Sequence, residues 1–193
     1  MANTSDIKNG LCMVLNNDIY TVIEFLHVKP GKGAAFVRTK LKSLTKDKVI
    51  DHTFNAGVKI NIARIERRPY QYLYKDHEGY HFMHTETFDQ LSMDPSIIKK
   101  PQFLKENQYV EVVYYDNENT ILSCELPPSV LLQVTYTEPG CRGDTATQCL
   151  KPAVLETGVE IRVPLFINIE DIIKVDTRTG LYVERVNQHK KNI

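Results

Sequence analysis

Hydrophobic residues recur at every second position along much of this 193-residue chain, and this alternation constrains the fold more than any other feature. The clearest runs are short and rich in the β-branched and aromatic side chains that favour strands. They cover residues 22–28, 109–115, 130–136, 160–167 and 172–175. Many short strands predict an all-β fold of small barrels or sandwiches, and the pattern shows none of the strand–helix alternation of a Rossmann-like sheet.

Turn-forming residues separate these runs, at positions 16–18, 30–33, 77–79, 116–119, 138–140 and 178–180. Helical signal is sparse. We expect one or two helical turns over residues 85–91, with Thr85 as N-cap, and another turn over residues 101–106. Both would act as short connectors that plug the ends of barrels.

Two breaks, near residues 64–66 and 126–129, divide the chain into three domains over residues 1–64, 65–128 and 129–193. Pro127 and Pro128 donate no ladder hydrogen bonds and stiffen the second connection. Segments of roughly 65 residues are long enough to fold as small barrels without metals or disulfides. We therefore expect three consecutive small β-barrels.

The zero formal net charge hides an uneven distribution. Residues 1–64 hold ten Lys/Arg against five Asp/Glu, residues 65–128 hold six against eleven, and residues 129–193 are balanced. A polyanion would favour the first third and be repelled by the second. Charge therefore predicts local contact with nucleic acid and not a groove along the whole chain.

Composition narrows the class further. With 42% hydrophobic and 25% charged residues, the chain is typical of soluble globular proteins. It lacks an apolar stretch of the roughly 18–20 residues that span a bilayer and shows no secretory signal, so we expect a cytoplasmic protein with no membrane partner. Its four cysteines form no C-x-x-C pair, which predicts free thiols and no cysteine-based metal site.

Pro30-Gly31-Lys32-Gly33 is the most unusual local feature of the sequence. Gly31 and Gly33 can adopt positive φ and leave no bulk beside the lysine, while Pro30 fixes the approach of the strand. The segment predicts a hairpin whose tip carries an exposed ammonium, although a solvated turn with an incidental lysine is the plainer alternative. Behind the tip we expect a basic collar of Lys29, Arg38, Lys40 and Lys42.

Common catalytic patterns do not occur in the sequence. The spacing around Lys32 is not that of a phosphate-binding loop, and there is no G-x-S-x-G or H-E-x-x-H motif. His77, His81 and His84 invite a metal site, but in a strand His84 would face away from the other two, so we interpret them as exposed strand histidines. We name no catalytic residue and no metal ligand.

Two segments of the last third are candidate binding sites. Gly143-Asp144-Thr145 predicts a tight turn that offers backbone N–H groups and a hydroxyl to a ligand, or an ordinary surface turn. Tyr182 and Arg185 follow a predicted hairpin turn at residues 178–180. They suit stacking on and pairing with RNA, but a strand that closes a barrel explains them as well.

Together these segments resemble the bacterial elongation factor P family along nearly the whole chain. The matching fragments are residues 25–36, 72–74, 81–83, 86–90, 143–146, 163–167 and 173–180. The resemblance implies an SH3-like, KOW-type barrel followed by two OB-fold barrels, arranged in an elongated L shape.

The resemblance also implies a function. Members of this family bind both ribosomal subunits beside peptidyl-tRNA and stimulate peptide-bond formation at consecutive prolines. Lys32 matches the tip residue that approaches the CCA end of peptidyl-tRNA and that a lysine-modifying enzyme extends in many members, for example by β-lysylation. Residues 143–145 match a loop near exit-site mRNA, and Tyr182 and Arg185 match positions of small-subunit or tRNA contact.

By the same resemblance the protein is a monomer and not an enzyme, and it needs no cofactor besides the modification of Lys32. Glu170, Leu181 and the tail over residues 187–193 depart from the family pattern. Other interpretations are an elongation factor P-like paralogue, a generic RNA-binding protein of OB barrels, and an enzyme with Lys32 as nucleophile. The last would require a desolvated lysine, which a glycine-flanked tip does not favour.

Overall fold

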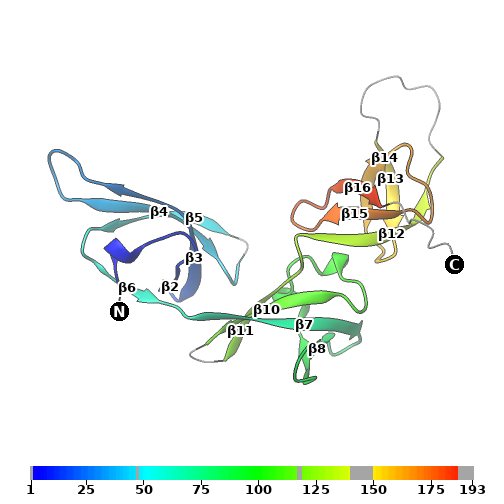
Figure 1. Ribbon diagram of the computed structural model, residues 1–193, viewed down its shortest axis with the longest axis horizontal. Coiled ribbons are helices and arrows are strands. Elements are labelled where there is room, and N and C mark those ends of the chain that lie inside the picture. Colours follow the sequence, from blue (N-terminus) through cyan, green and yellow to red (C-terminus); the bar gives the residue numbers. More distant parts are fainter. Residues whose placement is uncertain (1, 47, 117–118, 140–149, 187–193) are drawn as a thin grey trace. The chain divides into compact units, whose positions relative to one another are not determined.

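The computed structural model describes residues 2–46, 48–116, 119–139 and 150–186. Over these ranges the chain forms sixteen β-strands in three sheets and three single-turn 3-10 helices, with no α-helix (Figure 1). The all-β class expected from the sequence is confirmed. Nowhere in the described ranges is there a helix with the length and apolar character needed to cross a membrane.

The chain divides into two compact units. Unit 1 comprises Met1–Arg68 and Val112–Cys124, and unit 2 comprises Pro69–Glu111 and Glu125–Ile193. Near the first break expected from the sequence one strand ends at Ile62 and the next begins at Ile65, and near the second one strand ends at Glu125 and the next begins at Ser129. The three-domain division itself stays a prediction.

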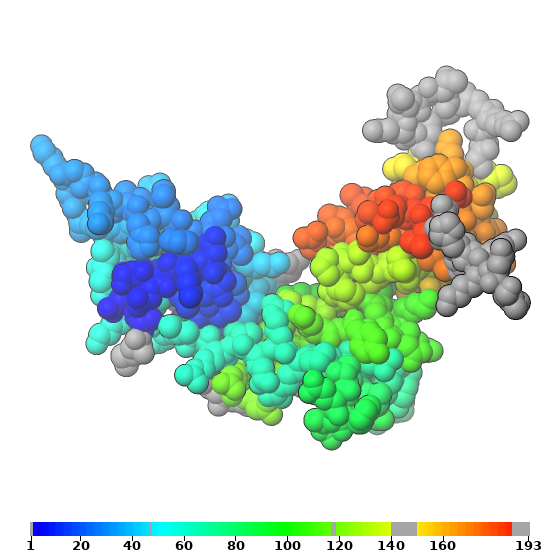
Figure 2. All heavy atoms as spheres, in the orientation of Figure 1, coloured from blue at the N-terminus to red at the C-terminus, as the bar shows by residue number. Residues whose placement is uncertain are grey.

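Unit 1 contains a sheet of strand order β1-β6-β2-β3-β4-β5. Its strands are β1 (Ala2–Asn3), β2 (Cys12–Leu15), β3 (Asp18–Val28), β4 (Phe36–Ser43), β5 (Val49–Asn55) and β6 (Lys59–Ile62). A 3-10 helix, η1 (Thr4–Asp6), follows β1. The hairpin of β3 and β4 projects from the body of this unit, as the blue ribbon of Figure 1 and the blue atoms of Figure 2 show.

Strand β4 shows the period-two pattern in its burial. Its buried residues, which alternate with exposed or half-buried ones, are Val37, Thr39, Leu41 and Ser43. Side chains from neighbouring strands complete the core on that face, among them Met13, Val22, Phe54 and Ile60. The alternation that the sequence shows is therefore the alternation between core and surface.

Asp18 anchors the start of β3. It follows a two-residue turn in which Asn16 and Asn17 have φ of 50° and 58°, the left-handed conformation that asparagine tolerates in tight hairpins. The buried Asp18 carboxylate accepts hydrogen bonds from the Ile19 backbone N–H at 2.8 Å and the Thr45 hydroxyl at 2.6 Å. It also accepts one from the hydroxyl of Ser43 on β4 at 3.0 Å, so a single side chain joins the first turn to the hairpin.

The middle sheet has the strand order β11-β10-β7-β8-β9. Its strands are β7 (Ile65–Lys75), β8 (Tyr80–His84), β9 (Gln90–Met93), β10 (Tyr109–Tyr115) and β11 (Thr120–Glu125). The unit boundary passes through β7, β10 and β11. In unit 2 the rings of Tyr72 and Phe82, on paired positions of β7 and β8, pack with centroids 5.3 Å apart.

The third sheet lies in unit 2 and has the order β14-β13-β12-β15-β16. Its strands are β12 (Ser129–Thr137), β13 (Leu150–Leu155), β14 (Glu160–Pro164), β15 (Ile172–Asp176) and β16 (Tyr182–Val186). The edge strands β14 and β16 approach each other, so the sheet is curled. Its core includes Leu132, Val134, Ile173 and Val175, all fully buried.

One of the two expected helical connectors is confirmed. Two 3-10 helices follow β9, η2 (Pro95–Ile97) and η3 (Pro101–Phe103), and Phe103 of η3 packs into the core of the third sheet. The helix expected over residues 85–91 is wrong. These residues form the turn between β8 and β9, because the pairing of the two strands leaves only residues 85–89 to connect them.

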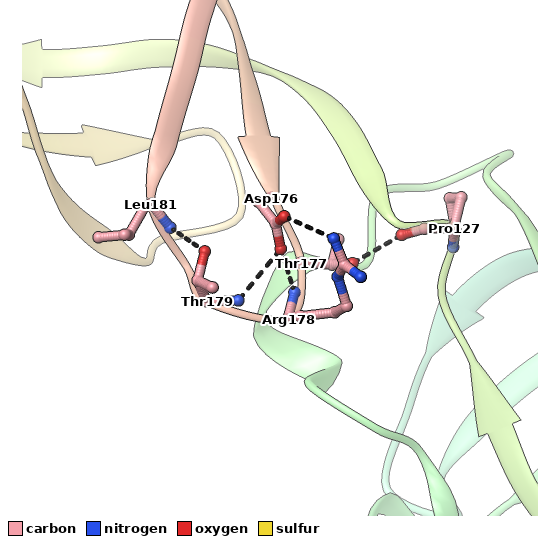
Figure 3. Close-up of polar contacts among 6 residues, drawn as sticks. All are labelled: Pro127, Asp176, Thr177, Arg178, Thr179 and Leu181. Atoms are coloured by element: carbon pink, nitrogen blue, oxygen red, sulfur yellow. Dashed lines mark hydrogen bonds and ion pairs between the residues drawn. The ribbon is translucent and has the colours of Figure 1, made fainter. Parts of the chain in front are cut away.

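The turn between β15 and β16 is tied to the segment that enters the third sheet (Figure 3). The Thr177 hydroxyl donates to the carbonyl oxygen of Pro127 at 2.6 Å, and the side chain is buried. The Asp176 carboxylate accepts from the backbone N–H groups of Arg178 and Thr179 and from the Arg178 guanidinium. The Arg178 hydrogen bond, followed by those of the two backbone groups, holds the pKa of Asp176 below its ordinary value.

The first prediction concerns acid stability. Burial by itself raises the pKa of Asp18, but the hydrogen bonds from Thr45, Ile19 and Ser43 outweigh it, so the pKa lies below the ordinary 3.8. The stability that the charged Asp18 contributes is therefore present above that value and is lost as the pH falls through the lower pKa of the folded state. We expect Asp18→Asn to lower the free energy of unfolding at neutral pH and to flatten its fall between about pH 5 and about pH 3.

Urea unfolding at a series of pH values measures this effect. The matched control is Asp51→Asn, which removes an exposed carboxylate of β5 and should leave the pH profile unchanged. If Asp18→Asn keeps the pH dependence of the wild type, the stabilising role of the charged Asp18 is wrong.

The second prediction concerns the bond between Thr177 and Pro127. Thr177→Val keeps the shape of the buried side chain but leaves the carbonyl of the half-buried Pro127 without this donor, so we expect a loss of about 1–2 kcal/mol in the free energy of unfolding. Thr177→Ser retains the hydroxyl and should recover most of that loss. Chemical denaturation of the two variants tests it, and equal stability of Thr177→Val and the wild type would contradict it.

Candidate functional site

The hairpin of β3 and β4 presents Lys32 at its tip. The two strands pair from Tyr20 and Ser43 out to Val28 and Phe36, and residues 29–35 connect them. Lys32 is exposed, as are the residues on either side of it. Within the described part of the chain its ammonium has no hydrogen bond and no ion pair. The hairpin therefore carries a free cation at the end of a paired two-stranded arm.

The two glycines that flank Lys32 differ in their backbone conformation. Gly33 has φ of 108°, a conformation that side-chain-bearing residues rarely adopt. Gly31 has no positive φ, and a Cβ placed there meets nothing within 4 Å. Of the two glycines that can adopt positive φ, Gly33 alone does so here. Pro30 lies beside Gly33, with its Cγ 3.8 Å from the position of a Cβ.

The arm of the hairpin is supported from a third strand. Beyond the end of β5, the backbone N–H of Ala56 donates to the carbonyl oxygen of Ala35 at 2.9 Å. The turn that follows is tied to the buried Thr4, whose hydroxyl accepts from the Gly57 N–H at 2.8 Å and whose N–H donates to the Val58 carbonyl at 3.1 Å. Sequence reasoning missed these residues, because nothing local marks a backbone contact between segments so far apart in the chain.

The basic collar is partly neutralised. The Lys40 ammonium lies 3.4 Å from a carboxylate oxygen of Glu24, its neighbour across the strands. The Arg38 guanidinium lies over the ring of Phe36, 5.5 Å from its centroid. Lys29 and Lys42 are exposed. Within the described residues, Lys40 is thus the member of the collar whose charge a carboxylate balances.

A hollow of about 450 Å³ is lined by residues of β3, β4 and β5 beside the arm. Its charged residues are Glu24, Arg38, Lys40 and Asp51, so two cations face two carboxylates. This balance of charge does not favour a small anionic ligand, in contrast to the free cation at the tip.

Of the candidate binding residues in the last third of the chain, the structure describes Tyr182 and Arg185. Residues 143–145 lie outside the described residues. Tyr182, on β16, pairs with Val175 and packs against the core of the third sheet. Arg185 is the fourth residue of β16, and its guanidinium lies 3.6 Å from a carboxylate oxygen of Asp171. The same guanidinium lies 5.5 Å from the centroid of the exposed Phe166 ring. Contact of Tyr182 and Arg185 with RNA stays a prediction.

Of the three histidines considered as metal ligands, His77 is exposed as expected from the sequence, whereas His81 and His84 are half-buried. His84 is half-buried, and its Nδ1 accepts from the backbone N–H groups of Glu86 and Thr87 at 3.2 and 3.1 Å. It therefore closes the turn after β8, where Thr85 was expected to act as a cap.

His81 belongs to a group of possible ligands at the turn between β7 and β8. Ligand atoms of Asp76, Glu78 and His81 lie within 4.8 Å of one another. However, Asp76 Oδ1 already accepts from the N–H groups of Glu78 and Gly79 and lies 2.9 Å from His81 Nε2. The His81 contact is the main reason that the pKa of Asp76 lies below its ordinary value. The hydrogen bonds that close this turn therefore explain why the three side chains lie together, without a metal ion.

Three protein families match successive parts of the chain. Residues 3–60 match the family described as elongation factor P (EF-P) KOW-like domain, residues 65–122 the elongation factor P (EF-P) OB domain, and residues 130–185 elongation factor P, C-terminal. The first two agree with the barrel types that the resemblance implied.

Curated relatives match over nearly their whole length. Elongation factor P of Amoebophilus asiaticus is 62% identical over 96% of this chain and 98% of its own. Elongation factor P 1 of Porphyromonas gingivalis is 55% identical over 97% of this chain and its own full length. Elongation factor P of Flavobacterium johnsoniae is 54% identical, again over 97% of this chain and its own full length.

Among solved structures, eukaryotic translation initiation factor 5A from Methanococcus jannaschii superposes with a TM-score of 0.50, covering 64% of this chain and 92% of its own. Its sequence identity of 19% limits this likeness to the fold. The family matches and the relatives agree with each other in order and extent. The chain therefore belongs to the elongation factor P family of translation elongation factors.

Proposed function

We propose that this chain binds the ribosome beside peptidyl-tRNA and stimulates peptide-bond formation at consecutive prolines. The observation that carries the proposal is the exposed, unpaired Lys32 at the end of the β3–β4 hairpin. A paired arm with a small, glycine-flanked tip can enter a crowded crevice, and its ammonium can contact the phosphates of the CCA end of the tRNA. Family membership supports the same role.

The proposed mechanism is positioning. Proline is a poor nucleophile, and its fixed φ misplaces the reacting ends in the ribosome. A factor that holds the peptidyl-tRNA in a near-attack arrangement lowers the entropic barrier without donating or accepting a proton. The peptidyl transferase remains the ribosome, and the chain is not an enzyme. In support, Lys32 is exposed, whereas a nucleophilic lysine is normally desolvated.

The further partners follow from the same proposal. The protein acts in the cytoplasm as a monomer, residues 143–145 contact mRNA in the exit site, and Tyr182 and Arg185 contact the small subunit or tRNA. A lysine-modifying enzyme extends Lys32, for example by β-lysylation, and the exposure of its ammonium makes the side chain accessible to that enzyme. A longer Lys32 side chain would reach farther from the same arm.

The third prediction tests the role of the tip. In a reconstituted translation system lacking the factor, the protein should rescue a reporter with consecutive prolines and leave a proline-free reporter unchanged. Lys32→Ala should reduce the rescue at least tenfold, since it removes the charge-assisted contact. The matched control is Lys29→Ala, which removes another exposed lysine of the same hairpin and should retain most of the rescue.

Protein purified from its own host, with any native modification of Lys32, is tested beside unmodified recombinant protein. Rescue by the host-derived protein alone would show that the modification is required. If neither preparation rescues the proline reporter, the proposed function is wrong. Equal losses for Lys29→Ala and Lys32→Ala would instead show that the hairpin acts through its overall charge.

The fourth prediction concerns the shape of the tip. Gly33→Ala places a Cβ on a residue with φ of 108°, at a cost of about 1 kcal/mol, which lowers the population of the observed tip conformation about fivefold. Gly31→Ala meets no such strain. Dose–response curves in the proline reporter assay should therefore show a weaker Gly33→Ala factor and a Gly31→Ala factor close to the wild type. Equal curves would mean that tip conformation does not limit activity.

A further inference from the structure

Phe88 has an unusual place in the turn between β8 and β9. Its φ is 63°, and 67% of the residue is exposed. Backbone groups and the His84 side chain hold the turn. The Phe88 N–H donates to the His84 carbonyl, and the His84 N–H donates to the Asp89 carbonyl. His84 Nδ1 accepts hydrogen bonds from two backbone N–H groups of the turn. The ring itself takes no part in these bonds.

Stability does not explain a phenylalanine at this position. A left-handed backbone is disfavoured for an aromatic residue and is readily adopted by glycine or asparagine. Among the described residues outside glycine, those with positive φ are otherwise Asn16, Asn17, Lys100, Asn107, Asn119 and Glu170. Phe88 is thus the one apolar side chain in this conformation within the described ranges. Strain of this kind, at a residue that is mostly exposed, points to a function of the side chain.

The charges around Phe88 indicate what it contacts. Glu86 and Asp89, on either side of it, are both exposed acidic residues. The sequence of the middle third is also acidic, with eleven Asp/Glu against six Lys/Arg over residues 65–128. An acidic surface repels phosphate, so RNA is disfavoured as a partner. An exposed aromatic ring flanked by carboxylates is complementary to an apolar pocket with Lys or Arg at its rim.

We propose that residues 84–90 form a protein-docking turn, in which Phe88 inserts into an apolar pocket of a basic protein and Glu86 and Asp89 pair with cations at the rim. The inference rests on the proposed function, since we place the basic partner among the proteins of the ribosome. It assigns to this turn a contact separate from those of Lys32 with tRNA.

The first test is whether the phenylalanine at position 88 lowers the thermal stability of the protein. Phe88→Asn and Phe88→Gly should raise the midpoint of thermal unfolding by about 2 °C, because they relieve the strain and lose little packing. The matched control is Tyr109→Asn, which removes a 63% exposed aromatic ring from β10, where the backbone is extended, and should not raise the midpoint. A fall in the midpoint for both Phe88 variants would overturn the argument, since the ring would then be a stabilising one.

The second test measures binding to purified ribosomes by sedimentation. Phe88→Asn should weaken binding about tenfold, as expected for a central anchor, while Tyr109→Asn should bind as the wild type does. The paired charge reversal Glu86→Lys with Asp89→Lys distinguishes the class of partner. It should weaken binding if the facing surface is a basic protein, and it should tighten binding if the surface is RNA.

The outcomes separate this inference from the proposed function. If the wild type does not bind ribosomes, the proposed function and this inference both fail. If the wild type binds and Phe88→Asn binds equally well, or if the charge reversal tightens binding, this inference alone is overturned. Weaker binding of both variants, together with the raised melting midpoint of Phe88→Asn, supports it.

Discussion

The antiparallel pairing of β3 with β4 is the interaction on which the candidate site depends. It continues beyond the buried part of the sheet to Val28 and Phe36, so backbone hydrogen bonds carry the arm where side chains such as Leu26 are exposed. Ala56, directly after β5, adds a hydrogen bond to the carbonyl oxygen of Ala35. The arm that carries Lys32 is therefore held by backbone hydrogen bonds, and the Lys32 side chain has no hydrogen bond or ion pair within the described residues.

Unit 2 relies on contacts between distant segments in a similar way. Phe103, from a single-turn helix, belongs to the core of a sheet whose strands begin about 25 residues later, and Gly180 lies beside its ring, where a Cβ would be in van der Waals contact with Cζ at 3.4 Å. Thr177 fixes the same turn to Pro127. The stiff proline pair thus gains a defined hydrogen-bond partner, and the last hairpin, which carries Tyr182 and Arg185, starts from a fixed point.

Local features of the sequence predicted much of this structure. The runs at residues 22–28, 109–115 and 172–175 are strands because alternation of burial is a property of each strand by itself. Asn16 and Asn17 indicated a tight turn because asparagine tolerates the left-handed backbone conformation that such a turn requires. The prediction failed at residues 85–91, where helical propensity was weaker than the pairing of β8 with β9. The sequence also did not show that Gly33, and not Gly31, takes positive φ, since both glycines of the turn can adopt it.

The sequence by itself determined the all-β class, most of the strands and the hairpin that carries Lys32, since each of these depends on residues close together in the chain. Only the tertiary structure showed the support of that hairpin through Ala56 and Thr4, the burial of Tyr182 against the core and the strain at Phe88. The support of the hairpin and the packing of Tyr182 arise from hydrogen bonds and packing between segments far apart in the chain, and a backbone N–H or carbonyl group leaves no trace in residue type. The residues that hold the site in place were therefore hidden until the strands were assembled.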